Sequence, residues 1–428
     1  MRVVYLAAGA AGMYCGSCLR DNRLVATLRK QGRDIVLIPL YTPLRTDETD
    51  VSEHAVFFGG INVYLQEKFA LFRKLPAAID RVLDRPALLR GVGRFATNTH
   101  AEDLGALTLA VLRGEHGPLR KEVERLIEAL RHYRPTLINL PNLMFIGIAA
   151  EMKAALGAAV ACTLGGEDLF LDQLPERERE EAFSIIRSRA EDVNAFIATT
   201  RYYADHCVEH FGLPAERMHD AHMGIHVSQR PIAHPPTEPF TICYVGRICP
   251  EKGLAGLCEA LAILARQRHN VRVRAAGHLR AADRAYLDLI QESLARKGLS
   301  ERFSYVGEVS LDEKLALLDE AHVFSMPTIY HEAKGLPVLE ALERGVPVIQ
   351  PRHGSFPELV EQTAGGVLVE PGNAGALADA IRSLMQDEPR RRTLGQTGRA
   401  AVIEKYAEDV MAEQTWALYE SILKRSTS

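Results

Sequence analysis

The segment Phe240-Thr241-Ile242-Cys243-Tyr244-Val245-Gly246 decides the fold, because it has the pattern of a buried strand that ends in a glycine turn. Six largely apolar residues, several of them β-branched or aromatic, are typical of a strand covered on both faces. Further short apolar runs follow it, separated by stretches with helical spacing, at 271–273, 303–306, 323–326 and 346–349. This alternation predicts βαβ units around a parallel sheet.

The same alternation fills the first half of the chain. Apolar runs occur at 3–6, 35–39, 136–139, 159–163 and 195–198. The two halves are separated by residues 229–239, which contain four prolines and no apolar periodicity. We therefore predict an α/β protein with two tandem, Rossmann-like, doubly wound parallel-sheet domains. Ligands bind beyond the carboxyl ends of such strands, so two facing domains would form a cleft.

The domain boundaries follow from these patterns. We predict an N-terminal domain at 1–228, a proline-rich linker at 229–239, a C-terminal domain at 240–405 and a terminal helix at 406–428. Residues 59–134 interrupt the pattern with helical spacing and no clear strand. Their alternating charges are typical of a solvated helix face, and a helical insertion that holds a second substrate is the functional alternative.

Composition restricts the classes of function. Of 428 residues, 47% are hydrophobic and 25% are charged, which is typical of a globular protein. The net charge of −4 argues against a nucleic-acid-binding surface. No apolar run reaches the roughly 18 residues of a membrane helix. We predict a cytoplasmic protein, and peripheral binding at the inner membrane face stays open for a lipid acceptor.

Two acidic residues bracket the most informative segment. Glu332 and Glu340 stand on either side of Ala-Lys-Gly-Leu-Pro-Val-Leu, and Pro337 suits the first position of a helix. The helix would present the free N–H groups of Gly335 and Leu336 to an anion. Carboxylates accept hydrogen bonds well, so vicinal hydroxyls of a sugar or ribose are natural partners. A surface helix with two incidental acids is the alternative.

Two cations follow the strand at 240–245. After Gly246, the loop contains Arg247 and Lys252, which would lie at the carboxyl end of the strand, where ligands bind. Arginine and lysine together suit a diphosphate. An ordinary solvated loop is the alternative, but both informative segments occur in the same predicted domain and each follows a strand.

In this order the residues resemble a known family. The matching positions are Gly246-Arg247, Glu251-Lys252-Gly253, Gly277, Gly307, Pro327, the Glu332/Glu340 pair, Gly345-Val346-Pro347-Val348 and Pro357-Glu358. The chain resembles nucleotide-sugar-dependent glycosyltransferases of the GT-B fold, and most closely the retaining group called glycosyltransferase family 4. The resemblance covers most of the chain and is most specific from 241 to 377.

The resemblance implies a function and a role for each residue. It implies transfer of a sugar from a nucleoside-diphosphate sugar to a hydroxyl of an acceptor, a saccharide, lipid or small molecule, with retention of configuration. Arg247 and Lys252 would neutralise the diphosphate, Glu332 would hold the sugar and Glu340 the ribose. Further donor contacts would come from Gly16, Gly246, Gly335 and Leu336. The terminal helix would cross back onto the N-terminal domain.

The chain departs from the family pattern in places. Cys15 replaces a glycine of the first loop, and Ala333 replaces the usual glycine after the first acid. Gly165 stands where the family commonly has a histidine that contacts the sugar. This difference puts the donor sugar and the efficiency of transfer in question, and Glu167 or Asp168 could compensate.

We predict that the chemistry needs neither metal nor cofactor. No Asp-x-Asp occurs, and the cations with the helix N-terminus can stabilise the departing diphosphate. Gly9-Ala-Ala-Gly12 has the wrong spacing for a nicotinamide dehydrogenase, and no phosphate loop of an NTPase appears. A non-catalytic nucleotide-sugar binder and a GT-B phosphorylase or epimerase remain alternatives. A zinc pair at His206 and His210 is a weaker one.

Overall fold

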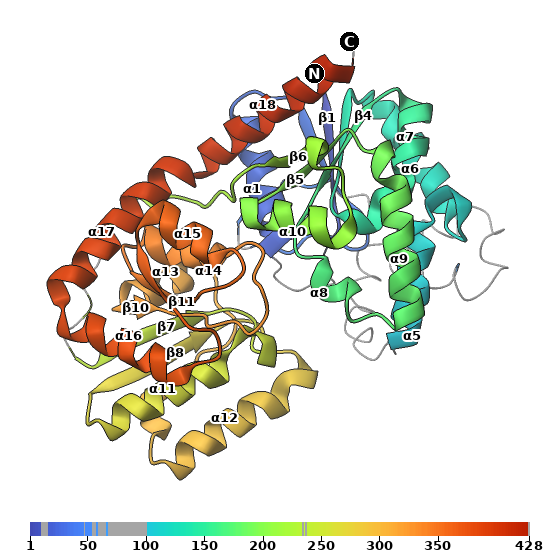
Figure 1. The fold of residues 1–428 in the computed structure, drawn as a ribbon. Helices are drawn as coiled ribbons and strands as arrows, with labels where there is room; N and C mark the ends of the chain where they lie inside the picture. The colour runs from blue at the N-terminus through green and yellow to red at the C-terminus, as the bar shows by residue number, and fades with distance from the viewer. Residues whose placement is uncertain are drawn as a thin grey trace. The chain divides into compact units, whose positions relative to one another are not determined.

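The computed structural model describes residues 1–9, 16–46, 48–53, 57–58, 66, 101–232, 235 and 238–426. The chain divides into two compact units, which we treat separately (Figure 1). The first unit comprises Met1–Gly224 together with Met411–Ser428, and the second comprises Ile225–Val410.

The first unit is built on a parallel sheet in the order β2-β1-β3-β4-β5-β6. Its strands are β1 (Val3–Ala7), β2 (Ile35–Pro39), β3 (Leu137–Leu140), β4 (Ala159–Thr163), β5 (Ala195–Ala198) and β6 (Met218–Asp220). Nearly all residues of β1 to β5 are buried, as expected for strands covered by helices on both faces. The strand order reverses between β1 and β3.

The described helices of the first unit connect these strands. They are α1 (Gly16–Lys30), α5 (Ala101–Leu112), α6 (Arg120–Tyr133), α7 (Ala149–Leu156), α8 (Asp168–Leu171), α9 (Glu176–Arg189) and α10 (Arg201–Phe211), with short 3-10 helices η3 (Gly114–His116), η4 (Leu143–Ile148), η5 (Ala190–Asp192) and η6 (Ala215–Arg217). In α6, Val123, Leu126, Ile127 and Leu130 form one buried stripe, which explains why this highly charged segment folds as a surface helix.

The second unit has a parallel sheet in the order β12-β11-β10-β7-β8-β9. Its strands are β7 (Phe240–Val245), β8 (Val271–Ala276), β9 (Phe303–Tyr305), β10 (Val323–Phe324), β11 (Val348–Pro351) and β12 (Gly366–Val369). The order reverses between β7 and β10. In doubly wound sheets, ligands bind beyond the carboxyl ends of the strands at such a reversal.

Helices also link the strands of this sheet. They are α11 (Leu254–Arg266), α12 (Arg284–Arg296), α13 (Leu311–Asp319), α14 (Leu336–Glu343), α15 (Phe356–Thr363), α16 (Ala374–Gln386) and α17 (Glu388–Lys405), with 3-10 helices η7 (Pro250–Lys252), η8 (Ala281–Asp283) and η9 (Ser300–Arg302). None of the described helices is both long enough and apolar enough to span a membrane.

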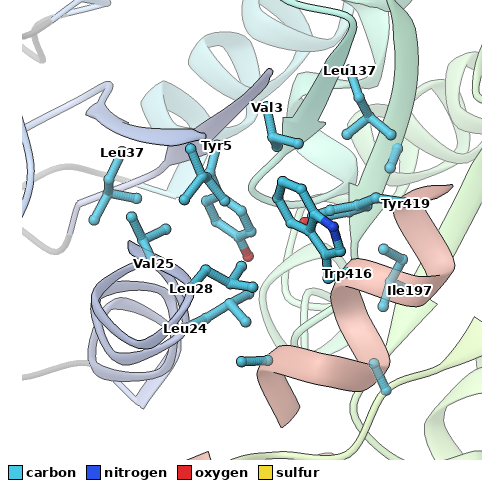
Figure 2. Close-up of a cluster of buried hydrophobic side chains, with 14 of the residues drawn as sticks. Val3, Tyr5, Leu24, Val25, Leu28, Leu37, Leu137, Ile197, Trp416 and Tyr419 are labelled. Carbon is cyan, nitrogen blue, oxygen red and sulfur yellow. The ribbon is translucent and has the colours of Figure 1, made fainter. Parts of the chain in front are cut away.

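The terminal helix α18 (Glu408–Ser426) completes the core of the first unit. Figure 2 shows Trp416 and Tyr419 of α18 packed beside Val3 and Tyr5 of β1 and against the apolar face of α1. Trp416 is 5% exposed and Tyr419 is fully buried. Residues of α18 therefore form part of the core that covers the first sheet.

The predicted fold class is confirmed: two doubly wound parallel sheets lie in tandem along the chain. The sequence missed β6, which is short and partly exposed, and β12, which begins directly at a Gly-Gly pair. In the structure, the second unit begins at Ile225, which forms a parallel bridge with Ala407, and the Ser228 N–H donates to Glu343 of the same unit. The domain boundaries given above stay predictions. Of the helical insertion at 59–134, residues 59–65 and 67–100 lie outside the described residues, and the described part from 101 is helical.

Candidate active site

Hydrogen bonds to backbone carbonyls hold the loop after β7, and the side chain of Arg247 stays exposed to solvent. The Tyr244 hydroxyl donates to the Arg247 carbonyl at 3.0 Å, and the Ile248 N–H donates to the His278 carbonyl at 2.9 Å. The Arg247 side chain is exposed, and its guanidinium makes no hydrogen bond or ion pair with the residues that the structure describes. Arg247 is thus available to an anion.

The loop after β10 ends in the N-terminus of α14. Gly335 caps this helix with a φ of 70°, and α14 begins at Leu336, so Pro337 is its second residue rather than its first. Among the described residues, nothing accepts a hydrogen bond from the amides of Gly335 and Leu336. The expected helix start with two unpartnered amides is therefore present, one residue earlier than predicted, and its binding of an anion stays a prediction.

The two loops contact each other directly. The Ile329 N–H donates to the Glu251 carbonyl at 2.8 Å, and Lys252 Nζ lies 2.7 Å from Glu332 Oε2. Gly253 is in a left-handed conformation, and a Cβ there would stand 1.7 Å from the Pro327 carbonyl oxygen. Because β7 and β10 are neighbours in the sheet, residues nearly 80 positions apart in the sequence meet at this edge.

Glu332 is a buried carboxylate that stays ionised. Burial would raise its pKa, but the charge of Lys252 and hydrogen bonds from Lys252 and Tyr330 outweigh that effect and lower the pKa to about 2. The Tyr330 hydroxyl lies 2.5 Å from Glu332 Oε2 and also bonds to Lys252. Lys252 is thus not a free cation here, because its charge is balanced by Glu332.

Tyr330 was missed by the sequence analysis. Burial raises the pKa of Tyr330, Glu332 adds to the rise, and the nearby charge of Arg247 opposes it. The hydroxyl therefore remains a phenol that can donate to Glu332. Its position two residues before the first acid was the only available signal, and many loop tyrosines share it.

Glu340 has a partner that the sequence did not indicate. Lys314 on α13 places Nζ 2.7 Å from Glu340 Oε1, and both side chains are about nine-tenths buried. Glu332 and Glu340 thus each face their own lysine. The spacing predicted their common segment, but only the packing of α13 beside α14 supplies Lys314.

The predicted contacts in the first unit lie at the starts of two helices. Gly16 is the first residue of α1 and is partly exposed. The Gly165 N–H donates to Glu167 Oε2 at 2.8 Å. Glu167 is 6% exposed and Asp168 is 8% exposed. Both acids already accept bonds within their own unit, so they form part of the framework of this loop.

Tyr203 on α10 and His206 hold these acids. The Tyr203 hydroxyl lies 2.8 Å from Asp168 Oδ1, and His206 Nε2 lies 3.4 Å from Asp168 Oδ2. Burial would raise the pKa of Asp168, but the bonds from His206 and Tyr203 lower it. His210 pairs instead with Asp172 at 2.9 Å. Within the described ranges, no group of three or more histidine, cysteine or acidic side chains could hold a metal ion.

Comparison with known proteins assigns the second unit. Residues 228–401 match the family described as "Glycosyl transferases group 1". This segment, which lies within the second unit, is therefore similar to glycosyltransferases of group 1. It contains the Arg247 loop, the Lys252–Glu332 pair, the start of α14 and the Lys314–Glu340 pair.

Curated proteins similar to this chain include glycosyltransferases of polysaccharide biosynthesis and of a phosphatidylinositol mannoside. The capsular polysaccharide biosynthesis glycosyltransferase CapM of Staphylococcus aureus is 29% identical over 44% of this chain and 47% of its own length. A GDP-mannose-dependent phosphatidylinositol monomannoside mannosyltransferase of Mycobacterium tuberculosis is 30% identical over 41% of this chain and 45% of its own. The matches thus span about half the length of these relatives.

Solved structures match along the whole chain. Sucrose-phosphate synthase from Thermosynechococcus elongatus superposes with a TM-score of 0.72 at 18% identity, covering 99% of this chain and 100% of that one. HepE from Anabaena, in complex with UDP, superposes with a TM-score of 0.69 at 16% identity, covering 98% and 100%. At such identities the likeness shows the fold, which is that of GT-B glycosyltransferases.

Proposed function

We propose that this chain transfers a sugar from a nucleoside-diphosphate sugar to a hydroxyl group of an acceptor. The observation that carries the proposal is the contact between two loops of the second unit, which together supply Arg247, the Lys252–Glu332 pair and the free amides of Gly335 and Leu336. The match to the group 1 glycosyltransferase family supports the proposal. Two similar proteins support it as well, a GDP-mannose-dependent mannosyltransferase and HepE, whose structure was solved in complex with UDP.

The residues can serve the reaction without a step through a metal ion. Breaking the anomeric bond leaves growing negative charge on the nucleoside diphosphate. Arg247 is free to bind this charge, and the amides at the start of α14 add their dipoles. The Lys252 ammonium would shift from Glu332 towards the phosphate. Glu332 and Tyr330 would then bind hydroxyls of the sugar. Retention of configuration stays a proposal from family resemblance.

A thermal-shift screen tests the binding half of the proposal. UDP, GDP and ADP, each alone and as the corresponding nucleoside-diphosphate sugars, should differ in their effect on the melting temperature. The reason is that a ligand that binds the native state raises its stability. We expect one base to raise the melting temperature of the full chain and Arg247→Ala to abolish most of that rise. Arg296→Ala, at the exposed end of α12, is the matched control and should respond like the wild type.

Turnover separates the enzyme from its alternatives. With the base identified, release of nucleoside diphosphate should fall by about 10²–10³-fold in Arg247→Ala, while the fold is retained. Product analysis distinguishes glycoside transfer from phosphorolysis or epimerisation. Binding without any product would favour a nucleotide-sugar binder, and equal turnover in Arg247→Ala and Arg296→Ala would remove Arg247 from the site.

A further inference from the structure

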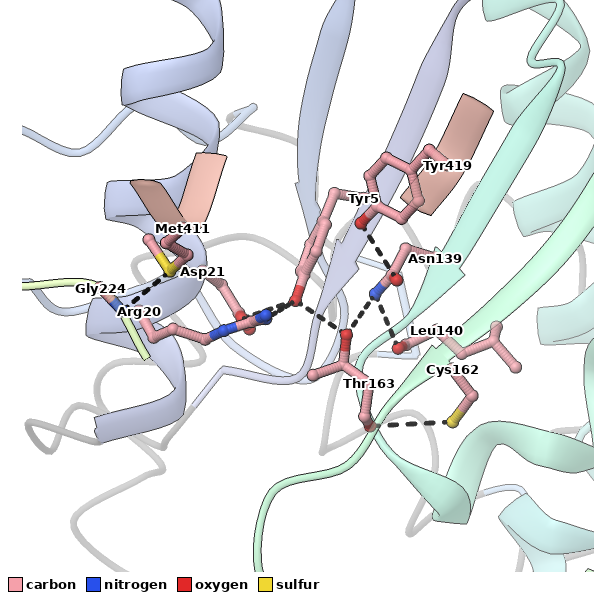
Figure 3. A network of polar contacts seen from close by, with 10 residues as sticks. All are labelled: Tyr5, Arg20, Asp21, Asn139, Leu140, Cys162, Thr163, Gly224, Met411 and Tyr419. Carbon is pink, nitrogen blue, oxygen red and sulfur yellow. Dashed lines mark hydrogen bonds and ion pairs between the residues drawn. The ribbon is translucent and has the colours of Figure 1, made fainter. Parts of the chain in front are cut away.

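A continuous chain of polar side chains crosses the core of the first unit (Figure 3). It runs across four elements and the terminal helix through Tyr419 of α18, Asn139 of β3, Thr163 of β4, Tyr5 of β1, and Asp21 and Arg20 of α1. All six residues are buried, with exposures of 6% or less. The proposed function does not use any of them.

The distances define each link. The Tyr419 hydroxyl lies 3.2 Å from Asn139 Oδ1, and Asn139 Nδ2 lies 2.9 Å from Thr163 Oγ1. The Thr163 and Tyr5 hydroxyls are 3.2 Å apart. At the far end, the Tyr5 hydroxyl lies 2.7 Å from Asp21 Oδ1 and 2.6 Å from a guanidinium nitrogen of Arg20.

Only one arrangement of protons satisfies all of these links. The Asp21 carboxylate can only accept a hydrogen bond, and the Arg20 guanidinium can only donate one. The Tyr5 hydroxyl therefore donates its proton to Asp21 and accepts a hydrogen bond from Arg20. Thr163 must then donate to Tyr5, which leaves the Thr163 lone pairs for the amide of Asn139. Burial raises the pKa of Tyr5, so this residue remains a phenol.

Two of these residues stand beside the sequence-predicted contacts of the first unit. Thr163 is the last residue of β4, two positions before Gly165. Arg20 lies about one turn into α1, four positions after Gly16. The two contacts are nearly 150 residues apart in the chain. The Tyr5 hydroxyl bonds to Thr163 on one side and to Asp21 and Arg20 on the other, so it links the end of β4 to the start of α1.

Stability alone gives a poor reason for this chain of bonds. Burying an ion pair costs desolvation energy, and apolar side chains of similar volume often stabilise a core equally well. Directional bonds, in contrast, fix distances and angles, and a misplacement of about 1 Å can reduce catalysis by about 10²-fold.

We propose that Thr163 and Tyr5 are positioning residues, whose bonded hydroxyls hold the Gly165 loop and the Gly16 end of α1 in the arrangement that sugar transfer needs. The inference rests on the proposed function and adds two residues to it. Neither side chain needs to touch a substrate. Both act through the backbone segments that they join.

The test uses a matched pair of variants in the full chain. Thr163→Val keeps the shape but removes the hydroxyl, and Thr163→Ser keeps the hydroxyl. Release of UDP or GDP from a panel of UDP- and GDP-sugars, with simple glycosides as acceptors, gives kcat and the donor KM. We expect Thr163→Val to lower kcat by about tenfold or more with the donor KM within about twofold, and Thr163→Ser to stay within about threefold of the wild type.

Tyr419→Phe separates positioning from stability. It removes a buried hydroxyl from the same series of hydrogen bonds, but at the α18 end, away from both predicted contacts. We expect a loss of melting temperature comparable to that of Thr163→Val with kcat within about twofold of the wild type. Equal kcat in Thr163→Val and Thr163→Ser, or equal slowing in Thr163→Val and Tyr419→Phe, would overturn the proposal.

The failure of the proposed function would look different. A wild-type chain that melts normally and releases no nucleoside diphosphate from any of the sugars would refute the transfer activity itself. The positioning role, which depends on that activity, would fall with it. An active wild type with an unaffected Thr163→Val variant refutes only the inference.

Discussion

Lys252 and Glu332 form a largely buried ion pair whose contact a ligand could replace. Their charged atoms are 2.7 Å apart and their side chains are 16% and 10% exposed. Such a pair loses most of its hydration, so its members stay together until other charged or hydroxyl groups replace the contact. A diphosphate and a sugar offer those two kinds of group, which is why we place the donor here.

Acid should weaken the fold through Glu332. Its pKa is depressed from an ordinary 4.5 to about 2 in the folded chain, so its contribution to stability is complete above about pH 4.5 and is lost as the pH falls towards 2. We expect Glu332→Gln to lower the free energy of unfolding by on the order of 3 kcal/mol at pH 7 and by much less at pH 3. Urea unfolding at both pH values measures this.

Glu292→Gln on α12 is the control for this change, because Glu292 is exposed. Its effect on the free energy of unfolding should be small, as for most exposed surface substitutions. A deficit of Glu332→Gln that stays constant down to pH 3 would contradict the depressed pKa.

At the scale of elements, two strand-to-helix connections form the candidate site. The connection from β7 to α11 and the connection from β10 to α14 approach so closely at Gly253 that no side chain can be placed between them. The left-handed conformation of Gly253 adds a second requirement for glycine, because other residues adopt it at a cost of about 1–3 kcal/mol.

Gly253→Ala should therefore separate the two loops. We expect a lower melting temperature and a nucleotide-induced shift reduced to less than half that of the wild type, measured in the same thermal-shift screen. Gly256→Ala is the matched control three residues further along α11, where an added Cβ meets nothing within 4 Å. Alanine should leave that position neutral or stabilise it by about 0.5–1 kcal/mol. Equal effects of the two variants would argue against the close contact.

At the scale of the whole molecule, the end of the chain belongs to the unit that contains its beginning. From Met411 onward, α18 packs in the first unit, and its side chains share a core with β1 and α1. The single tryptophan of the chain, Trp416, lies in that core, and the Arg33 guanidinium stacks over its ring at 5.1 Å. The first unit therefore depends on residues that the chain supplies last.

Trp416→Ala should destabilise the first unit strongly. Truncating a large buried aromatic side chain costs about 3–5 kcal/mol, because it removes burial and leaves a cavity. Calorimetry of the full chain measures the loss. Leu289→Ala is the control, since Leu289 is a large apolar residue that is 63% exposed on α12. A loss for Trp416→Ala as small as that for Leu289→Ala would contradict the docking of α18.

The sequence by itself determined the class of the fold and the two informative segments. Buried parallel strands are nearly continuous apolar runs, so β1 to β5 and β7 to β11 could be predicted from local composition. The turn after Val245 and the start of α14 could also be predicted from local sequence, because glycine permits turn conformations and proline has a fixed φ that suits the first turn of a helix. Short or glycine-flanked strands such as β6 and β12 lack that signal.

Only the tertiary structure decided which charges meet. The spacing of Glu332 and Glu340 gave no indication that each has a lysine of its own, because Lys252 and Lys314 come from other connections in the sheet. Tyr330, Thr163 and Tyr5 were equally invisible, since their roles depend on contacts between strands that are distant in sequence. Hydrogen bonds and ion pairs act over a few ångströms of space, and the order of strands in the sheet sets those distances.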